Sequence, residues 1–206
     1  MIEFLKQDHT IEEYIKYVND ILPIGTEKLW GYISSTDFFV APASTQYHGA
    51  HKHGLVKHSL AVWHALDNVT ANLLPGTFGL TQDVTNEGSE YQRDALVAAL
   101  FHDAVKCDLY KKVQKWRKDK FGKWEGYDGY EVDTGVIQID HGAESLRRIE
   151  KYYKFTHEGW AMAVAYHMGT PDDYIAKKQY YQAVEKYPEV FALHTADVYS
   201  TFILGY

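Results

Sequence analysis

The chain has 206 residues, enough to bury a full hydrophobic core as a single domain over residues 1–206. Its 46% hydrophobic content suits a globular protein, and its single cysteine excludes an internal disulfide and favours a reducing compartment. The net charge of −7 argues against general coating of nucleic acid, and no apolar run reaches the roughly 20 residues of a membrane span. Charges at Glu3, Lys6 and Asp8 argue against a signal peptide, so we expect the cytoplasm.

Capping residues, apolar spacing and helix-stopping residues predict the helices. Thr10 and Glu13 form a capping box before the first, and Pro75 with Gly76 ends the third. The proline and glycines of residues 38–54 predict a loop, as does the polar composition of residues 77–90. Seven helices are expected, at about residues 10–22, 26–34, 54–74, 91–103, 141–153, 157–168 and 188–204.

Residues 110–134 differ from the rest of the chain. The runs KKVQKWRKD and KWEGYDGYEVD flank Lys120-Phe121-Gly122 and predict a β-hairpin with Gly122 in its turn. Residues 111–123 hold seven of the 21 basic residues and one acid. The hairpin therefore suits a small anionic substrate, although a solvated surface hairpin explains the same composition. Four of its aromatic residues could stack a base: Trp116, Trp124, Tyr127 and Tyr130.

Polar residues recur on predicted buried helix faces or at helix ends. The segment FHDAVK closes the apolar run Ala95–Asp103, and an imidazole beside a carboxylate is costly to bury unless it is paired or binds metal. Other helices contribute His58, His141, His167 and Asp197. One such residue is usually a hydrogen-bonded core residue. Several in one domain favour a shared metal centre, which compensates all of them at once.

The spacing of these residues resembles the H…HD…D signature of HD-domain metal-dependent phosphohydrolases. The sequences around these residues are GLVKHSLAV, ALFHDAVK and LHTADVYST. The resemblance covers the chain from about residue 41 to the end. The segment that leads to His58, APASTQYHGAHKHGLVKH, is similar to the same region of HD proteins of phage and gut bacteria. Val105 departs from the HDxGK pattern of many members, whereas Lys106 keeps it. The resemblance implies an all-α HD-domain bundle with a small inserted hairpin.

The resemblance also implies roles for single residues. His58, His102, Asp103 and Asp197 would hold one metal ion, and Asp103 would bridge to a second ion completed by His141 and His167, as in HD phosphodiesterases and 3′→5′ exoribonucleases. Asp103 and Lys106 are the expected catalytic residues, with Lys106 on the substrate phosphate. Further substrate contacts are expected from His48, Lys111, Lys112, Lys115 and Arg117. His51 and His53 are expected to be bystanders.

The favoured function is hydrolysis of a nucleotide-type phosphodiester by metal-activated water. The imidazole-rich ligands favour two divalent transition metal ions (manganese, zinc, iron, cobalt or nickel) over magnesium alone. Two alternatives stay open: a one-metal nucleotidase or dNTP triphosphohydrolase, and a catalytically silent nucleotide-binding module. The expected partner is a nucleotide or short nucleic acid. No membrane partner is expected, a homo-oligomer is compatible with the sequence, and the cytoplasm would be the host's for a phage-encoded chain.

Overall fold

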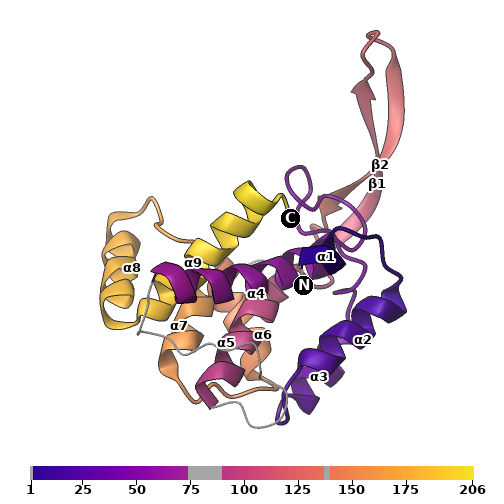
Figure 1. Cartoon of the computed structure of the whole chain (residues 1–206). Helices are drawn as coiled ribbons and strands as arrows, with labels where there is room; N and C mark the ends of the chain where they lie inside the picture. Colours follow the sequence, from indigo (N-terminus) through magenta and orange to yellow (C-terminus); the bar gives the residue numbers. More distant parts are fainter. Residues whose placement is uncertain (1, 74–89, 137–139) are drawn as a thin grey trace.

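The computed structural model describes residues 2–73, 90–136 and 140–206. These residues are mostly helical, with one two-stranded antiparallel sheet that projects from the helical body (Figure 1). The α-helices are α1 Ile2–Leu5, α2 Ile11–Ile21, α3 Glu27–Ile33, α4 Gly54–Leu73, α5 Glu90–Phe101, α6 His141–Glu150, α7 Glu158–Tyr166, α8 Tyr174–Lys186 and α9 Pro188–Tyr199.

The seven expected helices are present, with small shifts at their ends. The capping box before α2 is complete, because Thr10 Oγ1 accepts from Glu13 N at 3.2 Å and Glu13 Oε2 accepts from Thr10 N at 2.8 Å. The expected stop of α4 at Pro75-Gly76 and residues 77–89 of the expected loop lie outside the described residues. At the other end of the chain, α9 stops at Tyr199 and continues as a π-helical turn, Ser200–Leu204.

Helix α8 corrects the sequence interpretation, which expected no helix between residues 168 and 188. Asp173 caps it by accepting from Ala176 N at 2.9 Å. Tyr174 and Ile175 are exposed, and only Tyr180 and Ala183 are buried, so the helix has almost no apolar stripe for a periodicity argument to find. The short helix α1 was also missed.

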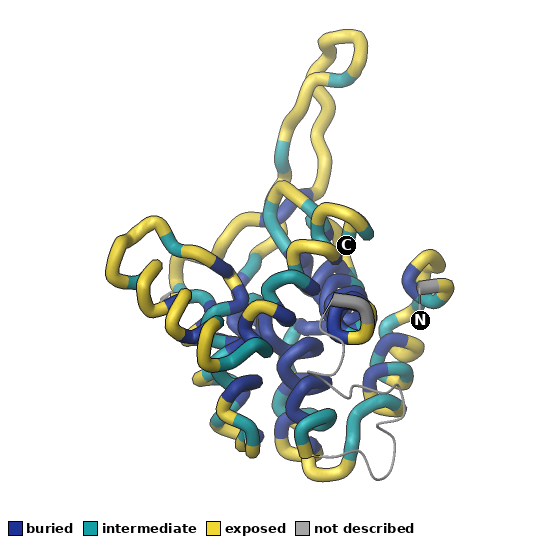
Figure 2. The backbone as a smooth tube through the Cα atoms, turned by 60° about the vertical axis from the view of Figure 1, so that its left-hand side comes forward, coloured by how far each residue is buried: buried dark blue, intermediate teal, exposed yellow. Residues whose placement is uncertain are grey.

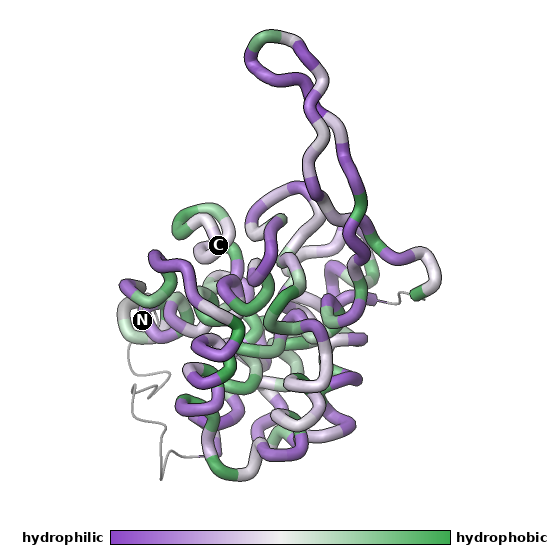
Figure 3. The backbone as a smooth tube through the Cα atoms, turned by 90° about the vertical axis from the view of Figure 1, so that its right-hand side faces the viewer, coloured by the Kyte–Doolittle hydropathy of each residue, from purple (hydrophilic) through white to green (hydrophobic). Residues whose placement is uncertain are grey.

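The core forms where α4 packs against α5 and α9, and α7 packs against α6 and α9. Every residue of α5 from Asp94 to Phe101 is buried, as the apolar run predicted. Figure 2 shows buried segments gathered in these central helices, and Figure 3 shows that hydrophobic residues concentrate there. None of the helices within the described ranges is long and apolar enough to cross a bilayer.

A buried carboxylate joins α5 to the turn between α6 and α7. The side chain of Asp94 is fully buried and accepts from Tyr153 Oη at 2.5 Å, from Thr156 N at 2.9 Å and from His157 N at 2.8 Å. A buried carboxylate needs such donors to offset its lost hydration. The bonds fix α5 relative to the pair α6–α7.

The sheet is the hairpin expected from the sequence. Strands β1 (Tyr110–Lys118) and β2 (Trp124–Val132) pair antiparallel from Tyr110 opposite Val132 to Lys118 opposite Trp124. Gly122 lies in the connecting turn with φ +80°, a conformation that favours glycine. The hairpin is mostly exposed and hydrophilic (Figures 2 and 3).

Candidate metal centre

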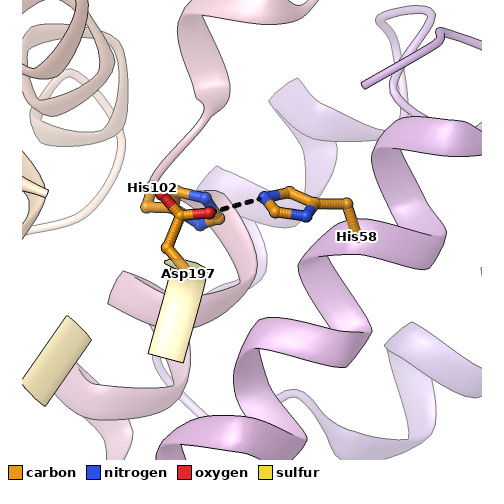
Figure 4. A group of neighbouring side chains, drawn as sticks. All are labelled: His58, His102 and Asp197. Atoms are coloured by element: carbon orange, nitrogen blue, oxygen red, sulfur yellow. Dashed lines mark ion pairs between the residues drawn. The ribbon is translucent and has the colours of Figure 1, made fainter. Parts of the chain in front are cut away.

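Helices α4, α5 and α9 bring three of the expected ligands together (Figure 4). His58 lies on the buried face of α4, His102 directly follows α5, and Asp197 lies on α9. His58 Nε2 is 3.1 Å from Asp197 Oδ1. One ligand atom from each of these residues lies within 4.8 Å of the others, so the three could hold one ion.

Helices α6 and α7 supply His141 and His167. His141 is the first residue of α6, His167 follows the last residue of α7, and their ring centroids are 5.4 Å apart. The helices can approach this closely because residue 142 is glycine. A Cβ there would lie 2.1 Å from the carbonyl oxygen of Ala165. Gly142 is therefore a packing requirement of this side of the site.

Asp103 lies between the two sets of histidines. Its Oδ2 is 3.6 Å from His58 Nε2 and 3.5 Å from His102 Nε2. Its Oδ1 is 2.7 Å from His141 Nε2 and 3.5 Å from His167 Nε2. The carboxylate thus presents one oxygen to each set, and Asp103, His102 and His167 form a second group that could hold an ion. All six expected ligands are in one place.

Main-chain carbonyls fix the tautomers of three imidazoles. The Nδ1 atoms donate to the main-chain oxygens of Tyr206, Ala99 and Val164, at 3.1 Å from His58, 2.9 Å from His102 and 2.7 Å from His167. Because a carbonyl only accepts, Nδ1 carries a proton in each ring, and Nε2 is the nitrogen that faces the carboxylates. Nε2 of His102 and of His167 is buried without a hydrogen-bond partner among the described residues. Such unpartnered buried nitrogens fit a metal ion.

The electrostatics favour charged carboxylates and one neutral imidazole. Burial lowers the pKa of His102 to about 4. Burial also opposes ionisation of Asp103, but Lys106 and His102 outweigh it and hold the pKa of Asp103 well below its ordinary value. For Asp197, burial is likewise outweighed, by His58 and His102, and its pKa is lowered. Anionic carboxylates beside neutral imidazole are what metal binding requires.

Lys106 and His48 border the ligands. Lys106 lies in the 3₁₀ turn Ala104–Lys106, and its Nζ is 2.6 Å from Asp103 Oδ2. Burial lowers the pKa of Lys106, but the charge of Asp103 outweighs this effect and raises it, so the ammonium stays charged. The His48 ring lies 5.4 Å from that of His58. Both residues thus lie beside candidate metal ligands.

Helix α6 fixes the turn that carries Lys106. Arg148 Nη1 donates to the carbonyl oxygens of Ala104, at 3.2 Å, and Cys107, at 2.9 Å. Ser145 Oγ accepts from Val105 N at 3.2 Å. Valine at position 105, where many HD proteins have glycine, is buried within this arrangement. The turn therefore accommodates the side chain of Val105 in a buried position.

The four hairpin cations expected to bind substrate differ in their partners. Lys111 and Arg117 form ion pairs with Glu131 at 3.0 Å and Glu125 at 2.6 Å. Lys115 Nζ donates to the carbonyl oxygen of Thr45 at 3.2 Å. Lys112 is exposed. Three of the four cations thus already have partners within the described chain, and Lys112 has no ion pair there.

Other histidines lie outside the ligand set. His51 and His53 line a polar cavity of about 410 Å³ with Asp8, His9 and Lys57, and none of the candidate ligands lines it. His194 Nδ1 donates to the carbonyl oxygen of His167, a candidate ligand, at 2.7 Å.

The sequence interpretation did not single out Tyr110, the first residue of β1. Burial raises the pKa of Tyr110, and Lys106 and Asp103 both act on its hydroxyl. Its position four residues after Lys106 was the available signal, but tyrosine is frequent throughout the hairpin.

No known protein family matches the chain, and neither the curated proteins nor the solved structures include a significant match to it.

Proposed function

We propose that the chain is an HD-domain metal-dependent phosphohydrolase that cleaves a nucleotide-type phosphodiester. One observation carries the proposal: four histidines lie within 3.6 Å of Asp103, Asp197 lies 3.1 Å from one of them, and two buried Nε2 atoms lack partners in the described part of the chain. Hydrogen bonding alone leaves those imidazoles uncompensated, whereas metal ions compensate them together.

The proposal assigns the donors to two ions. His58, His102, Asp103 and Asp197 would hold one, and Asp103, His141 and His167 the other. Imidazole and carboxylate donors favour manganese, iron, cobalt, nickel or zinc. When bound, such ions supply Lewis acidity toward phosphate oxygens and hydroxide at neutral pH.

The residues of the chain would orient the substrate around this centre. Lys106 keeps its charge beside Asp103 and would donate to a non-bridging phosphate oxygen. His48, half-buried next to His58, would contact the leaving group or the sugar. Burial, followed by the charge of His58, lowers the pKa of His48, which favours its neutral form.

A one-metal nucleotidase is the second candidate. The side chain of His141 is 29% exposed, whereas His58, His102 and His167 are almost fully buried, and His141 Nε2 contacts Asp103 directly. In that case His141 would bind phosphate instead of metal. A catalytically silent nucleotide-binding module has no observation of its own in its favour.

Elemental analysis of the purified protein, combined with a hydrolysis screen of cyclic, linear and polymeric nucleotides, tests the proposal. We expect bound transition metal, hydrolysis of diesters and loss of both in excess chelator. Thermal unfolding gives a readout independent of activity. Manganese should raise the Tm of the wild type and of His51→Ala, an exposed histidine outside the ligand set, but not that of Asp103→Ala. Full hydrolysis by Asp103→Ala would refute the proposal.

A further inference from the structure

The two faces of the hairpin differ in a way that the sequence does not reveal. Strand register places alternate residues on opposite faces. The face that we call the aromatic face carries Tyr110, Lys112, Gln114, Trp116 and Lys118 with Trp124, Gly126, Asp128, Tyr130 and Val132. The other, the ion-paired face, carries Lys111, Val113, Lys115 and Arg117 with Glu125, Tyr127, Gly129 and Glu131.

Cations on the ion-paired face are already engaged. Lys111 and Arg117 meet glutamates of the opposite strand, and Lys115 bonds to a main-chain carbonyl. On the aromatic face, neither Lys112 nor Lys118 forms an ion pair with any carboxylate of the described residues. The cations available to an anionic ligand are therefore those of the aromatic face.

The same face presents two exposed indoles. The exposed fractions are 64% for Trp116 and 60% for Trp124, and the Nζ of Lys118 lies 5.5 Å from the Trp124 ring centroid. Gly126 is opposite Trp116, and a Cβ there would lie 3.5 Å from the indole and 2.9 Å from Gln114 Nε2. Aromatic rings beside free cations are the elements with which proteins bind single-stranded nucleic acid.

The aromatic face begins a short way along the chain from the metal centre. Its first residue, Tyr110, starts β1 four residues after Lys106, the last residue of the 3₁₀ turn that follows Asp103. Trp116 and Lys118 follow six and eight residues later, about 20 and 26 Å along an extended strand. A stacked strand of nucleic acid advances about 3.4 Å per nucleotide, so this length corresponds to about six to eight nucleotides. A mononucleotide bound at Asp103 would not reach the indoles.

The net charge of the hairpin is opposite in sign to that of the rest of the chain. Residues 110–132 carry seven Lys or Arg and four Asp or Glu, a net +3 within a chain of −7, so the remainder carries −10. A polyanion is attracted to the hairpin and repelled by most of the body.

We propose that the aromatic face of the hairpin binds single-stranded nucleic acid and leads one end of it to the metal centre. This inference rests on the proposed function and specifies its substrate class as a polymer. In this proposal the phosphate contacts are Lys112 and Lys118, whereas the sequence predicted Lys111, Lys112, Lys115 and Arg117.

Fluorescence anisotropy with labelled oligothymidylates of 4, 8 and 16 nucleotides, in chelator to prevent cleavage, tests the inference with the full chain. Affinity should increase from 4 to 8 nucleotides and then level off. Trp116→Ala/Trp124→Ala should raise the Kd of the 8-mer at least about tenfold. Lys112→Gln/Lys118→Gln should reduce the slope of log affinity against log salt by about 1.4, because each phosphate contact contributes about 0.7.

The matched control is Lys111→Gln/Arg117→Gln, which removes the same charge from the ion-paired face and should change the slope less than half as much. Equal effects of the two pairs, or affinity independent of length, would overturn the inference. So would indole substitutions that change the molecular mass in solution without changing the affinity, because the hairpin would then be a self-association arm. Tight oligonucleotide binding without hydrolysis of any diester would instead overturn the proposed function alone.

Discussion

Asp103 Oδ1 lies 2.7 Å from His141 Nε2, although 38 residues and the whole hairpin separate these residues in the sequence. The contact brings the start of α6 to the end of α5. It also leaves the other oxygen of Asp103 facing His58 and His102.

This position makes Asp103 the residue whose charge matters most. Asp103→Asn keeps the side-chain volume but removes the negative charge between the two sets of histidines. We expect hydrolysis to fall at least about 1,000-fold, because metal-assisted charge stabilisation contributes several kcal/mol. Steady-state kinetics measures the loss. Asp108→Asn is the control, since Asp108 bonds to the backbone of Asp37 and should retain activity.

Metal stoichiometry separates one ion from two. Wild type saturated with manganese should bind two ions, and His141→Ala/His167→Ala should bind about one and lose diesterase activity. Equilibrium dialysis with elemental analysis gives the count, and circular dichroism checks that the variant folds. A wild type that binds a single ion at saturation would make the one-metal nucleotidase the better interpretation.

Gly142 tests whether close packing of α6 and α7 positions their histidines. Gly142→Ala places a Cβ against the carbonyl of Ala165 and should destabilise the protein by about 1–3 kcal/mol. It should also weaken metal binding, because His141 moves away from Asp103. Gly31→Ala in α3 is the matched control. No atom lies within 4 Å of its added Cβ, so the exchange should stabilise by about 0.4–1 kcal/mol in urea unfolding.

Glu144 should make stability depend on acid pH. Its hydrogen bond with Arg147, together with Arg148, lowers the pKa of Glu144 from 4.5 to about 2. A lowered folded-state pKa means that this contribution is complete above pH 4.5 and is lost as the pH falls toward 2. Glu144→Gln should therefore cost about 1–3 kcal/mol at pH 7, and the difference from wild type should shrink below pH 4.5. Urea midpoints between pH 3 and 7 measure it, and a constant difference would contradict the assignment.

Elements with strong local signals were predictable from the sequence. The apolar stripe of α4 located His58, and the uninterrupted apolar run of α5 located the pair His102–Asp103. Helix α8 lacked such a signal, because Tyr174, Ile175 and Tyr181 face solvent and only Tyr180 and Ala183 are buried. The capping residue Asp173 was the other available signal for this helix, but a capping residue without an apolar stripe is weak evidence for a helix.

Features that depend on the third dimension were not predictable. Sequence spacing indicated that His141 and His167 could meet, but not that Gly142 permits it or that a carbonyl fixes the His167 tautomer. The hairpin cations show the same limit. Composition marked Lys111 and Arg117 as free charges, and only the strand register reveals their glutamate partners.

The carboxylate of Asp94 has a consequence for how the protein folds. Its donors come from residues 153–157, so burying α5 before that turn closes would leave a charge in the core without partners. We therefore expect burial of α5 and closure of the turn to occur as one cooperative event. The helices that carry Asp103, His141 and His167 then belong to one unit of unfolding, and their amides should exchange hydrogen at a common free energy.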